Sequence, residues 1–480
     1  MAWYYLSPRG DDANSGTEEH PWRTPEHAVR QLCPGDTLFF RAGVYLLAER
    51  IEPPSGAAGA PITLMAYPGE EAVIDGAALD AADFHQRPRP YHAETGLFHL
   101  VNASHIVIRD LHIINSYWAG INIHDSQYVD LINNTVERTF GPGIAIWDMS
   151  RQGVCHHHRV LGNTVIKANT WDMQPIRGYE PLNEPPHEAI SIAGAHHFEV
   201  AFNHVHHCEK EGIDVKETSK HGVVHHNYVH HVWRQGLYVD TWFGVLEDVE
   251  LHHNVVHDCG GAGIAVSVED HEVLRDIRIH HNLVFNNQGS GLYFSRWGKD
   301  QLRQRIYVYN NTFHHNGHGR PEPGQRYRYI TGGIYLYSTN IEDVEIRDNL
   351  ITDNCGFQIG YSELWLAEGP DVAAVLRRKN VQVTDNWLDD RCNTGLEYPI
   401  NFGWPGYYHD AYPLPGDETL SGDPGFVDAA NGDFSLRPDS PVAQMGRQIG
   451  AYAPGERPDF WWKENFPPTI ATPEQMPVFP

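Results

Sequence analysis

The chain has 480 residues with 35 basic and 62 acidic side chains, so its formal net charge is −27 when histidine is neutral. A surface this negative excludes nucleic acid and anionic membranes as ordinary partners, and no apolar run reaches the length of about 18 residues that would span a membrane. The hydrophobic fraction of 41% excludes a disordered chain. The six cysteines form no Cys-x-x-Cys motif, which favours buried free thiols in a reducing compartment.

The sequence of residues 1–100 indicates the opening coils and the cap of a β-rich domain. A short helix is expected over Thr24–Leu32, and the segment Gly35–Tyr45 predicts two short strands separated by a turn. The N-terminus leads directly into polar residues, without a charged and apolar leader. We therefore expect a cytoplasmic protein.

Residues 101–390 repeat one phrase, in which a short alternating strand ends at an asparagine or aspartate. The anchors of this phrase are spaced by 24 to 40 residues and are Asp110, Asn134, Asn163, Asn203, Asn227, Asn254, Asn282, Asn311, Asn349 and Asn386. A second phrase of the type Gly-Ile-x-Val stands between them, for example at Gly236–Val239 and Gly263–Val266. Both phrases have the period of 2 that is typical of strands.

A repeat of 24 to 29 residues without a helix is typical of one coil of a right-handed parallel β-helix. Propeller blades need about 40 or more residues, and leucine-rich repeats need their own leucine spacing. The recurrent asparagines are expected to form an internal ladder at a bend. We predict one all-β domain over residues 1–455, with closing coils at 391–455 and an aromatic tail at 456–480 that packs on the domain or against a second subunit of a homo-oligomer.

Three of the longer spacings predict loops inserted between strands, at Ala168–Pro186, His318–Ile330 and Phe357–Arg378. Many of the 32 histidines stand beside the anchors, as in His252-His253-Asn254. Stacked imidazoles on a solvated face explain them. No carboxylate or cysteine completes a ligand set in that column, so we predict no metal and no cofactor.

When the Gly-Ile-x-Val phrases are aligned, charged and aromatic residues gather on one face of a few consecutive coils. The face carries Asp214, Lys216, Tyr238, Asp240, Trp242, Glu269, Tyr293, Arg296 and Trp297, with Glu188 and Glu211 at strand starts. A solvated face with a Lys216–Asp240 ion pair would explain the charges. It would not explain the interleaved aromatic rings, which are costly to expose.

Two carboxylates between aromatic platforms suit glycoside chemistry, in which one carboxyl protonates the leaving oxygen and the other attacks or activates water. Asp240 and Glu269 are predicted on adjacent strands and two residues apart along them, with carboxyl groups about 5 to 8 Å apart. That range includes both the retaining and the inverting arrangement, so the stereochemistry stays open.

The opening segment Tyr4–Thr17 resembles that of carbohydrate-active β-helix proteins, a group that includes lyases and hydrolases. The stretch Gly236-Leu237-Tyr238-Val239-Asp240-Thr241-Trp242, followed one coil later by an acid, resembles the glycoside hydrolase family 120 β-xylosidases. The resemblance implies Asp240 as the nucleophile. In that family the acid/base glutamate takes the fifth position of its strand, where this chain has Ser267, and Glu269 lies two residues further on.

A more distant resemblance exists to polysaccharide lyase family 9, carried by Gly212-Ile213-Asp214-Val215-Lys216. It implies Lys216 as a base that removes a proton from a uronate. No aspartate cluster in the sequence resembles the calcium site of that family, and the net charge of −27 disfavours a polyanionic substrate.

We therefore predict a hydrolase acting on a neutral oligosaccharide, with Asp240 as nucleophile and Glu269 as acid/base. Lys216, Asp214 and Glu188 would bind sugar hydroxyls together with Arg296. The rings that would stack on the sugar are Tyr238, Trp242, Tyr293 and Trp297. The alternatives are a uronate lyase using Lys216 and a non-catalytic carbohydrate-binding β-helix.

Overall fold

The structure is a computed structural model of the chain. It describes residues 1–79, 95–173, 185–270, 272–318, 331–389, 409–416, 419–456 and 462. Within these residues the chain divides into two compact units, one over residues 1–214 and the other over residues 215–465. Strand β18 (Ile213–Lys216) contains the boundary.

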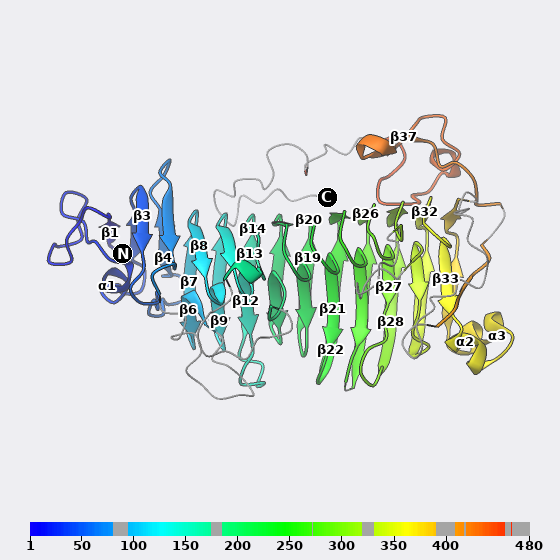
Figure 1. Cartoon of the computed structure of the whole chain (residues 1–480), viewed down its shortest axis with the longest axis horizontal. Helices are drawn as coiled ribbons and strands as arrows, with labels where there is room; N and C mark the ends of the chain where they lie inside the picture. The colour runs from blue at the N-terminus through cyan, green and yellow to red at the C-terminus, as the bar shows by residue number, and fades with distance from the viewer. Residues whose placement is uncertain are drawn as a thin grey trace. The chain divides into compact units, whose positions relative to one another are not determined.

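The first unit consists of successive coils whose strands form three parallel sheets, and the third sheet begins only at β6 (Figure 1). The first sheet contains β1 (Trp3–Leu6), β2 (Thr37–Phe40), β4 (Ile62–Ala66), β7 (Ser104–Arg109), β10 (Gln127–Ile132), β13 (His156–Leu161) and β16 (His196–Ala201). The second contains β3 (Gly43–Leu46), β5 (Ala72–Asp75), β8 (His112–Ser116), β11 (Thr135–Thr139), β14 (Thr164–Ile166) and β17 (His204–His206). The third contains β6 (Gly96–Val101), β9 (Ala119–His124), β12 (Ile144–Trp147) and β15 (Ile190–Ala193).

The second unit repeats this arrangement. Its first sheet contains β19 (Lys220–His225), β22 (Val245–His252), β25 (Val273–His280), β28 (Leu302–Tyr309), β31 (Ile341–Arg347) and β34 (Val381–Thr384). Its second contains β20 (Tyr228–His230), β23 (Val255–His257), β26 (Leu283–Phe285), β29 (Thr312–His314), β32 (Leu350–Thr352) and β35 (Trp387–Leu388). Its third contains β21 (Leu237–Thr241), β24 (Ile264–Val268), β27 (Leu292–Phe294), β30 (Ile334–Leu336), β33 (Ile359–Ser362) and β36 (Ala411–Pro413).

The core of each coil is built from apolar residues that stack on their equivalents in the next coil. In the second unit Val239 pairs with Val266, and Val266 pairs with Phe294, all of them fully buried. Because side chains alternate along a strand, the residues between them face away from this core. The parallel β-helix predicted from the repeat is confirmed.

Left-handed backbone at the corners explains the histidine surplus. The residue before each ladder position has a positive φ, for example 54° at Asn133, 52° at His253 and 52° at Asn310. Asparagine, aspartate and histidine tolerate this conformation better than other non-glycine residues. The imidazoles stack as predicted, with His253 centred 4.9 Å from His226, but His226 is only 5% exposed, so the face is not fully solvated.

The asparagine ladder is confirmed within each unit. Asn134 donates to the Oδ1 of Asn163 over 3.0 Å in the first unit, and Asn254 donates to that of Asn282 over 2.9 Å in the second. Asp110 is not a member of the ladder, because the backbone N–H of Leu111 donates to Asn134. Asp110 is instead a left-handed corner residue, with a φ of 58°.

The ends and insertions differ in part from the prediction. The predicted helix is present as α1 (Pro25–Val29), and the insertion Ala168–Pro186 includes the short helix η2 (Trp171–Met173). The segment Phe357–Arg378 is not only a loop, because it contains β33 and the helices α2 (Leu364–Glu368) and α3 (Val372–Arg378). Most of the insertion at 318–330 lies outside the described residues.

The predicted closing coils do not add parallel strands after β35 among the described residues. β36 pairs antiparallel with β33, and β37 (Phe426–Asp428) pairs antiparallel with β38 (Asp433–Leu436). The short helices η3 (Ala429–Asn431) and η4 (Ala443–Met445) complete this segment. Of the tail, only residues 456 and 462 are described, and the side chain of Trp462 is buried in a cluster of the second unit.

The described cysteines are all free thiols, as predicted. Cys155, Cys208 and Cys259 are buried, whereas Cys33 is exposed. Cys392 lies outside the described residues.

Candidate active site

Asp240 and Glu269 come from neighbouring strands of the second unit. In the register between β21 and β24, Asp240 pairs with Ser267, and Glu269 directly follows the last residue of β24. This is the offset expected from the sequence. Both side chains are buried, with exposed fractions of 2% for Asp240 and 7% for Glu269.

The backbone of Glu269 is held from both sides. Its N–H donates to the carbonyl of Thr241 over 2.9 Å, and its carbonyl accepts from the N–H of Lys299 over 2.6 Å. Gly298, with a φ of 52°, makes this approach possible, because a Cβ there would lie 2.0 Å from the Glu269 carbonyl oxygen. The position of the carboxyl group is therefore tied to two neighbouring coils.

Tyr238 contacts one of the two carboxyl groups. Its hydroxyl donates to Glu269 Oε1 over 2.6 Å. Burial raises the pKa of Tyr238 well above its usual value, and the charges of Glu269 and Asp240 raise it further. Tyr238 is therefore a neutral hydrogen-bond donor at neutral pH. The bond fixes the position of one oxygen of Glu269.

Aromatic residues continue the row that Tyr238 begins. Tyr238 pairs in register with Ala265, Ala265 with Tyr293, and Tyr293 with Tyr335. The ring centroids of Tyr293 and Tyr335 lie 5.8 Å apart. This row is buried in a cluster that also contains Tyr337, Phe357 and Ala411. The rings are thus partly enclosed rather than presented on an open face.

The remaining predicted residues of the second unit differ in exposure. Trp242 is 51% exposed, and its backbone N–H donates to Glu217 over 3.0 Å. Arg296 is exposed and lies 3.4 Å from Asp300, whereas Trp297 is half-buried. Lys216 is 8% exposed. Trp242 and Arg296 are therefore accessible to a solute, and Lys216 is largely enclosed.

Arg303 is a fully buried residue of β28 that the sequence pattern does not single out. Its side chain is fully buried and donates to the carbonyls of Val266 over 3.3 Å and Ser295 over 2.5 Å. Asp300 accepts from it over 2.9 Å. Burial lowers the pKa of Arg303, and Asp300 opposes that shift. The signal was present in the repeat, since Arg303 pairs in register with Leu274, an apolar core position.

Two predicted residues belong to the first unit. Glu188 is 7% exposed and accepts a hydrogen bond of 2.7 Å from the Ser191 hydroxyl. Asp214 is 1% exposed at the end of the unit. Their predicted role in binding sugar hydroxyls stays a prediction.

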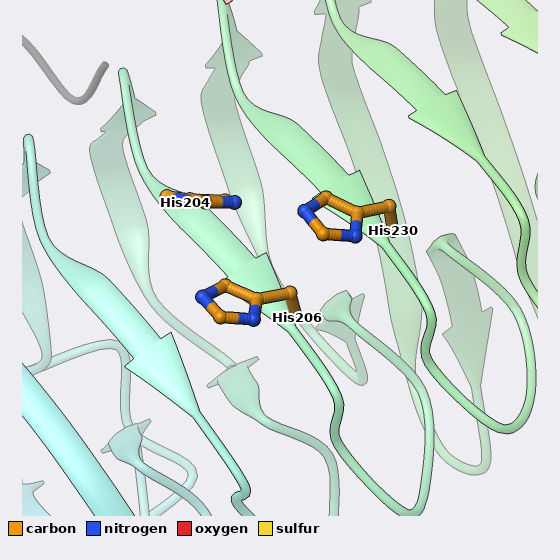
Figure 2. A group of neighbouring side chains, drawn as sticks. All are labelled: His204, His206 and His230. Atoms are coloured by element: carbon orange, nitrogen blue, oxygen red, sulfur yellow. The ribbon is translucent and has the colours of Figure 1, made fainter. Parts of the chain in front are cut away.

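Two histidines of β17 lie close together. Figure 2 shows His204 and His206 on this strand, and their ring centroids lie 4.2 Å apart. The third ring drawn there, His230, ends β20 of the second unit. Imidazole nitrogen is a ligand for zinc, copper and nickel. The expectation of no metal stays a prediction.

Comparison with known proteins identifies the family. A family described as a right-handed beta helix region matches residues 95–275 and 272–387. This chain belongs to the right-handed β-helix family. A family described as the Pel9A-like right-handed beta helix region matches residues 4–175 of this β-helix protein. In the described part of the chain, no helix is long and apolar enough to cross a membrane.

Two curated relatives match shorter stretches of this β-helix protein. The pectate lyase PEL9 of Emericella nidulans is 33% identical over 166 residues, which are 34% of this chain and 40% of the lyase. The uncharacterized protein YwoF of Bacillus subtilis is 32% identical over 124 residues, which are 26% of this chain and 25% of YwoF. The chain therefore spans less than half the length of either relative.

Two solved structures match this chain at low identity. Pectate lyase Pel9A is 15% identical, with coverage of 73% of this chain and 75% of its own and a TM-score of 0.41. XylC in complex with xylose is 13% identical, with coverage of 73% and 69% and a TM-score of 0.44.

Proposed function

We propose that this β-helix protein is a glycoside hydrolase acting on a neutral oligosaccharide, with Asp240 as nucleophile and Glu269 as acid/base. The observation that carries the proposal is the pairing of two buried carboxyl groups on adjacent strands, one of which accepts a 2.6 Å hydrogen bond from Tyr238. Two carboxyl groups flanking a bond are the apparatus of most glycoside hydrolases. The curated relative with a named activity acts on a polysaccharide, which supports a carbohydrate substrate.

The proposed reaction has two steps. Asp240 attacks the anomeric carbon while Glu269 gives its proton to the departing glycosidic oxygen, so that a glycosyl–aspartate ester forms and an alcohol leaves. Glu269, now a carboxylate, then removes a proton from water, which displaces Asp240 and releases the sugar. Stereochemistry at the anomeric carbon is retained.

The remaining side chains would orient the sugar. Tyr238 fixes the oxygen of Glu269 that does not carry the proton, and Tyr293 extends the aromatic row beside it. Lys216 and Arg296 would donate to hydroxyls, as would Trp242 and Trp297 through their indole N–H groups while their faces stack on the ring. Glu188 and Asp214 are proposed to accept from hydroxyls.

The charge balance supports a neutral rather than an anionic substrate. The net charge of −27 repels a polyanion unless a site is locally basic. Of the candidate residues named above, only Lys216 and Arg296 carry a positive charge. The resemblance to the glycoside hydrolase family 120 β-xylosidases makes a pentose substrate the first to test.

A screen of aryl glycosides and uronate polymers tests the proposal. We expect turnover of at least one aryl glycoside, and a loss of about 1,000-fold or more in kcat/KM for Asp240→Asn. Azide should restore turnover to Asp240→Ala and yield a glycosyl azide of inverted anomeric configuration, whereas loss of the acid/base would give one of retained configuration. Asp276→Asn is the matched control, because Asp276 pairs with Arg305 on the neighbouring first sheet. Unchanged activity in Asp240→Asn would overturn the assignment.

A uronate lyase with Lys216 as base is the second candidate. The Pel9A-like match and the 33% identity with a pectate lyase favour it, although the Pel9A-like match ends at residue 175, before Lys216. A lyase would release unsaturated products that absorb ultraviolet light, and Lys216→Met would abolish them. Such products from a uronate polymer would exclude the hydrolase. A non-catalytic binding protein would show no turnover in either assay.

A further inference from the structure

A cavity on the second sheet of the second unit is separate from the carboxylate pair. It has a volume of about 620 Å³ and lies over the ends of β23, β26 and β29. The short helix η3 and Phe434 of the closing segment line its other side. Asp240 and Glu269 belong to the third sheet and do not line it. A volume of this size accommodates a small ligand.

One part of the cavity wall is aromatic. The ring centroids of Phe285 and Phe434 lie 4.9 Å apart, and those of Phe285 and Trp462 lie 6.3 Å apart. His314 packs edge-on to Phe434 at 5.3 Å. Phe434 and Trp462 belong to one buried cluster of the closing segment, and the partly buried Phe285 packs against it, so the wall is a fixed part of the fold rather than a loose surface patch.

Two aspartates form the polar part of the lining. Asp258 accepts from His257 Nδ1 over 2.5 Å and from the amide of Asn286. Asp353 accepts from His315 Nδ1 over 2.9 Å. Burial raises the pKa of Asp258, but the hydrogen bond from His257 and the charge of that imidazole outweigh burial, so the pKa of Asp258 is lowered overall. The hydrogen bond from His315 lowers the pKa of Asp353. Both groups are therefore carboxylates at neutral pH, with fixed orientations.

We propose that this cavity is an accessory binding site for a neutral saccharide. A sugar offers hydroxyl donors to the two carboxylates and a face of C–H groups to the aromatic wall. An anionic ligand would meet two carboxylates, and a purely apolar one would remove both from water without giving hydrogen bonds in return. The site would hold a second part of the substrate or a second chain of a polysaccharide, and it does not depend on the catalytic roles of Asp240 and Glu269.

Binding of xylobiose, cellobiose and maltose to the full chain tests the proposal, by calorimetry and saturation-transfer NMR. We work in the Asp240→Asn background, which prevents turnover. We expect at least one of these sugars to bind, and the double variant Asp258→Asn, Asp353→Asn to weaken that binding at least tenfold or to remove one site from the stoichiometry. Asn keeps the volume of each side chain but loses the charge and one acceptor oxygen.

The control is Asp439→Asn, an exposed aspartate of the same closing segment with a side chain that is 84% exposed. Phe434→Leu is a second variant, which shortens the aromatic wall and keeps it apolar; it too should weaken binding. Equal affinity and stoichiometry in the double variant and the control would overturn the proposal. So would binding of choline, a cationic probe, with none of the three sugars. If the wild type hydrolyses no aryl glycoside but still binds a sugar in this cavity, only the proposed hydrolase activity is refuted.

Discussion

The hydroxyl of Tyr238 donates a hydrogen bond of 2.6 Å to Glu269 across two adjacent strands. Because both groups are buried, neither can exchange its partner for bulk water. The bond therefore fixes the position of one oxygen of Glu269. It also ties the geometry of the site to the register of β21 and β24, which depends on the stacked apolar residues beneath.

Removal of the Tyr238 hydroxyl should reduce activity while the fold persists. We expect Tyr238→Phe to lower kcat/KM by about 10-fold, which corresponds to about 1.4 kcal/mol of transition-state stabilisation. The same variant leaves a buried carboxyl oxygen without its donor, so the free energy of unfolding should fall by about 1 to 2 kcal/mol. Steady-state kinetics on the best aryl glycoside and urea unfolding measure the two effects.

Tyr293→Phe is the control for that experiment, since Tyr293 is in the same row but two coils away. It should change kcat/KM less than Tyr238→Phe. If the two variants behave alike, the hydrogen bond to Glu269 has no special role.

Substitution of Arg303 alone should lower the free energy of unfolding strongly. Arg303→Leu leaves Asp300 buried without its main cation, so we expect a loss of about 3 to 5 kcal/mol in the free energy of unfolding. The double variant Arg303→Leu, Asp300→Asn should recover part of this loss, because it removes the stranded charge. Arg305→Leu, which breaks a more exposed pair with Asp276, should cost no more than about 1 kcal/mol. Equal losses for Arg303→Leu and Arg305→Leu in urea unfolding would contradict this account.

The repeat predicted the register of the site but not its contacts. Tyr238, Ala265, Tyr293 and Tyr335 are aligned as the Gly-Ile-x-Val phrases indicate, because a period of 2 fixes which residues share a face. The Tyr238–Glu269 bond depends on side-chain rotamers, which no spacing determines.

Other misses have similar physical reasons. The sequence pattern does not distinguish Asp110 from a ladder residue, because aspartate and asparagine suit both the ladder and the left-handed corner beside it. In a second ladder Asn287 donates to Asn316 over 2.9 Å and Asn316 to Asn354 over 3.0 Å. Its signal in the sequence is an asparagine five residues after each of the three anchors Asn282, Asn311 and Asn349. The antiparallel closing pairs were not predictable from the repeat, because they lie beyond it.

The ladder predicts that an internal asparagine is more costly to lose than an exposed amide. Asn282 donates to Leu251 and Asn311 and accepts from the backbone N–H of Asn254 over 3.0 Å. Asn282→Ala should lower the free energy of unfolding by about 3 kcal/mol, since it leaves buried groups without partners. Gln382→Ala, on an exposed side chain of β34, should change it by less than about 0.5 kcal/mol. Similar urea midpoints for the two variants would show that the ladder contributes little.

The buried histidines predict loss of stability in mild acid. Burial, and then the neighbouring imidazoles, lowers the pKa of His226 to about 2 and that of His252 and His253 to about 3, from an ordinary value of 6.5. At pH values between the lowered pKa of the folded state and the ordinary value of 6.5, these histidines bind protons in the unfolded chain but not in the folded chain. The free energy of unfolding is therefore highest above pH 6.5 and falls as the pH drops below 6.5. At about pH 5 the loss should be up to about 2 kcal/mol for each such histidine.

His226→Asn with His253→Asn tests this origin, because asparagine already occupies the equivalent left-handed corners at Asn133 and Asn310. The double variant should show a smaller difference in unfolding free energy between about pH 7.5 and pH 5 than the wild type, measured by urea denaturation at each pH. The control is His231→Asn, an exposed corner histidine with a φ of 53°, which should leave the difference unchanged. An undiminished pH dependence in the double variant would mean that carboxyl groups, not the imidazole columns, set the acid limit of the fold.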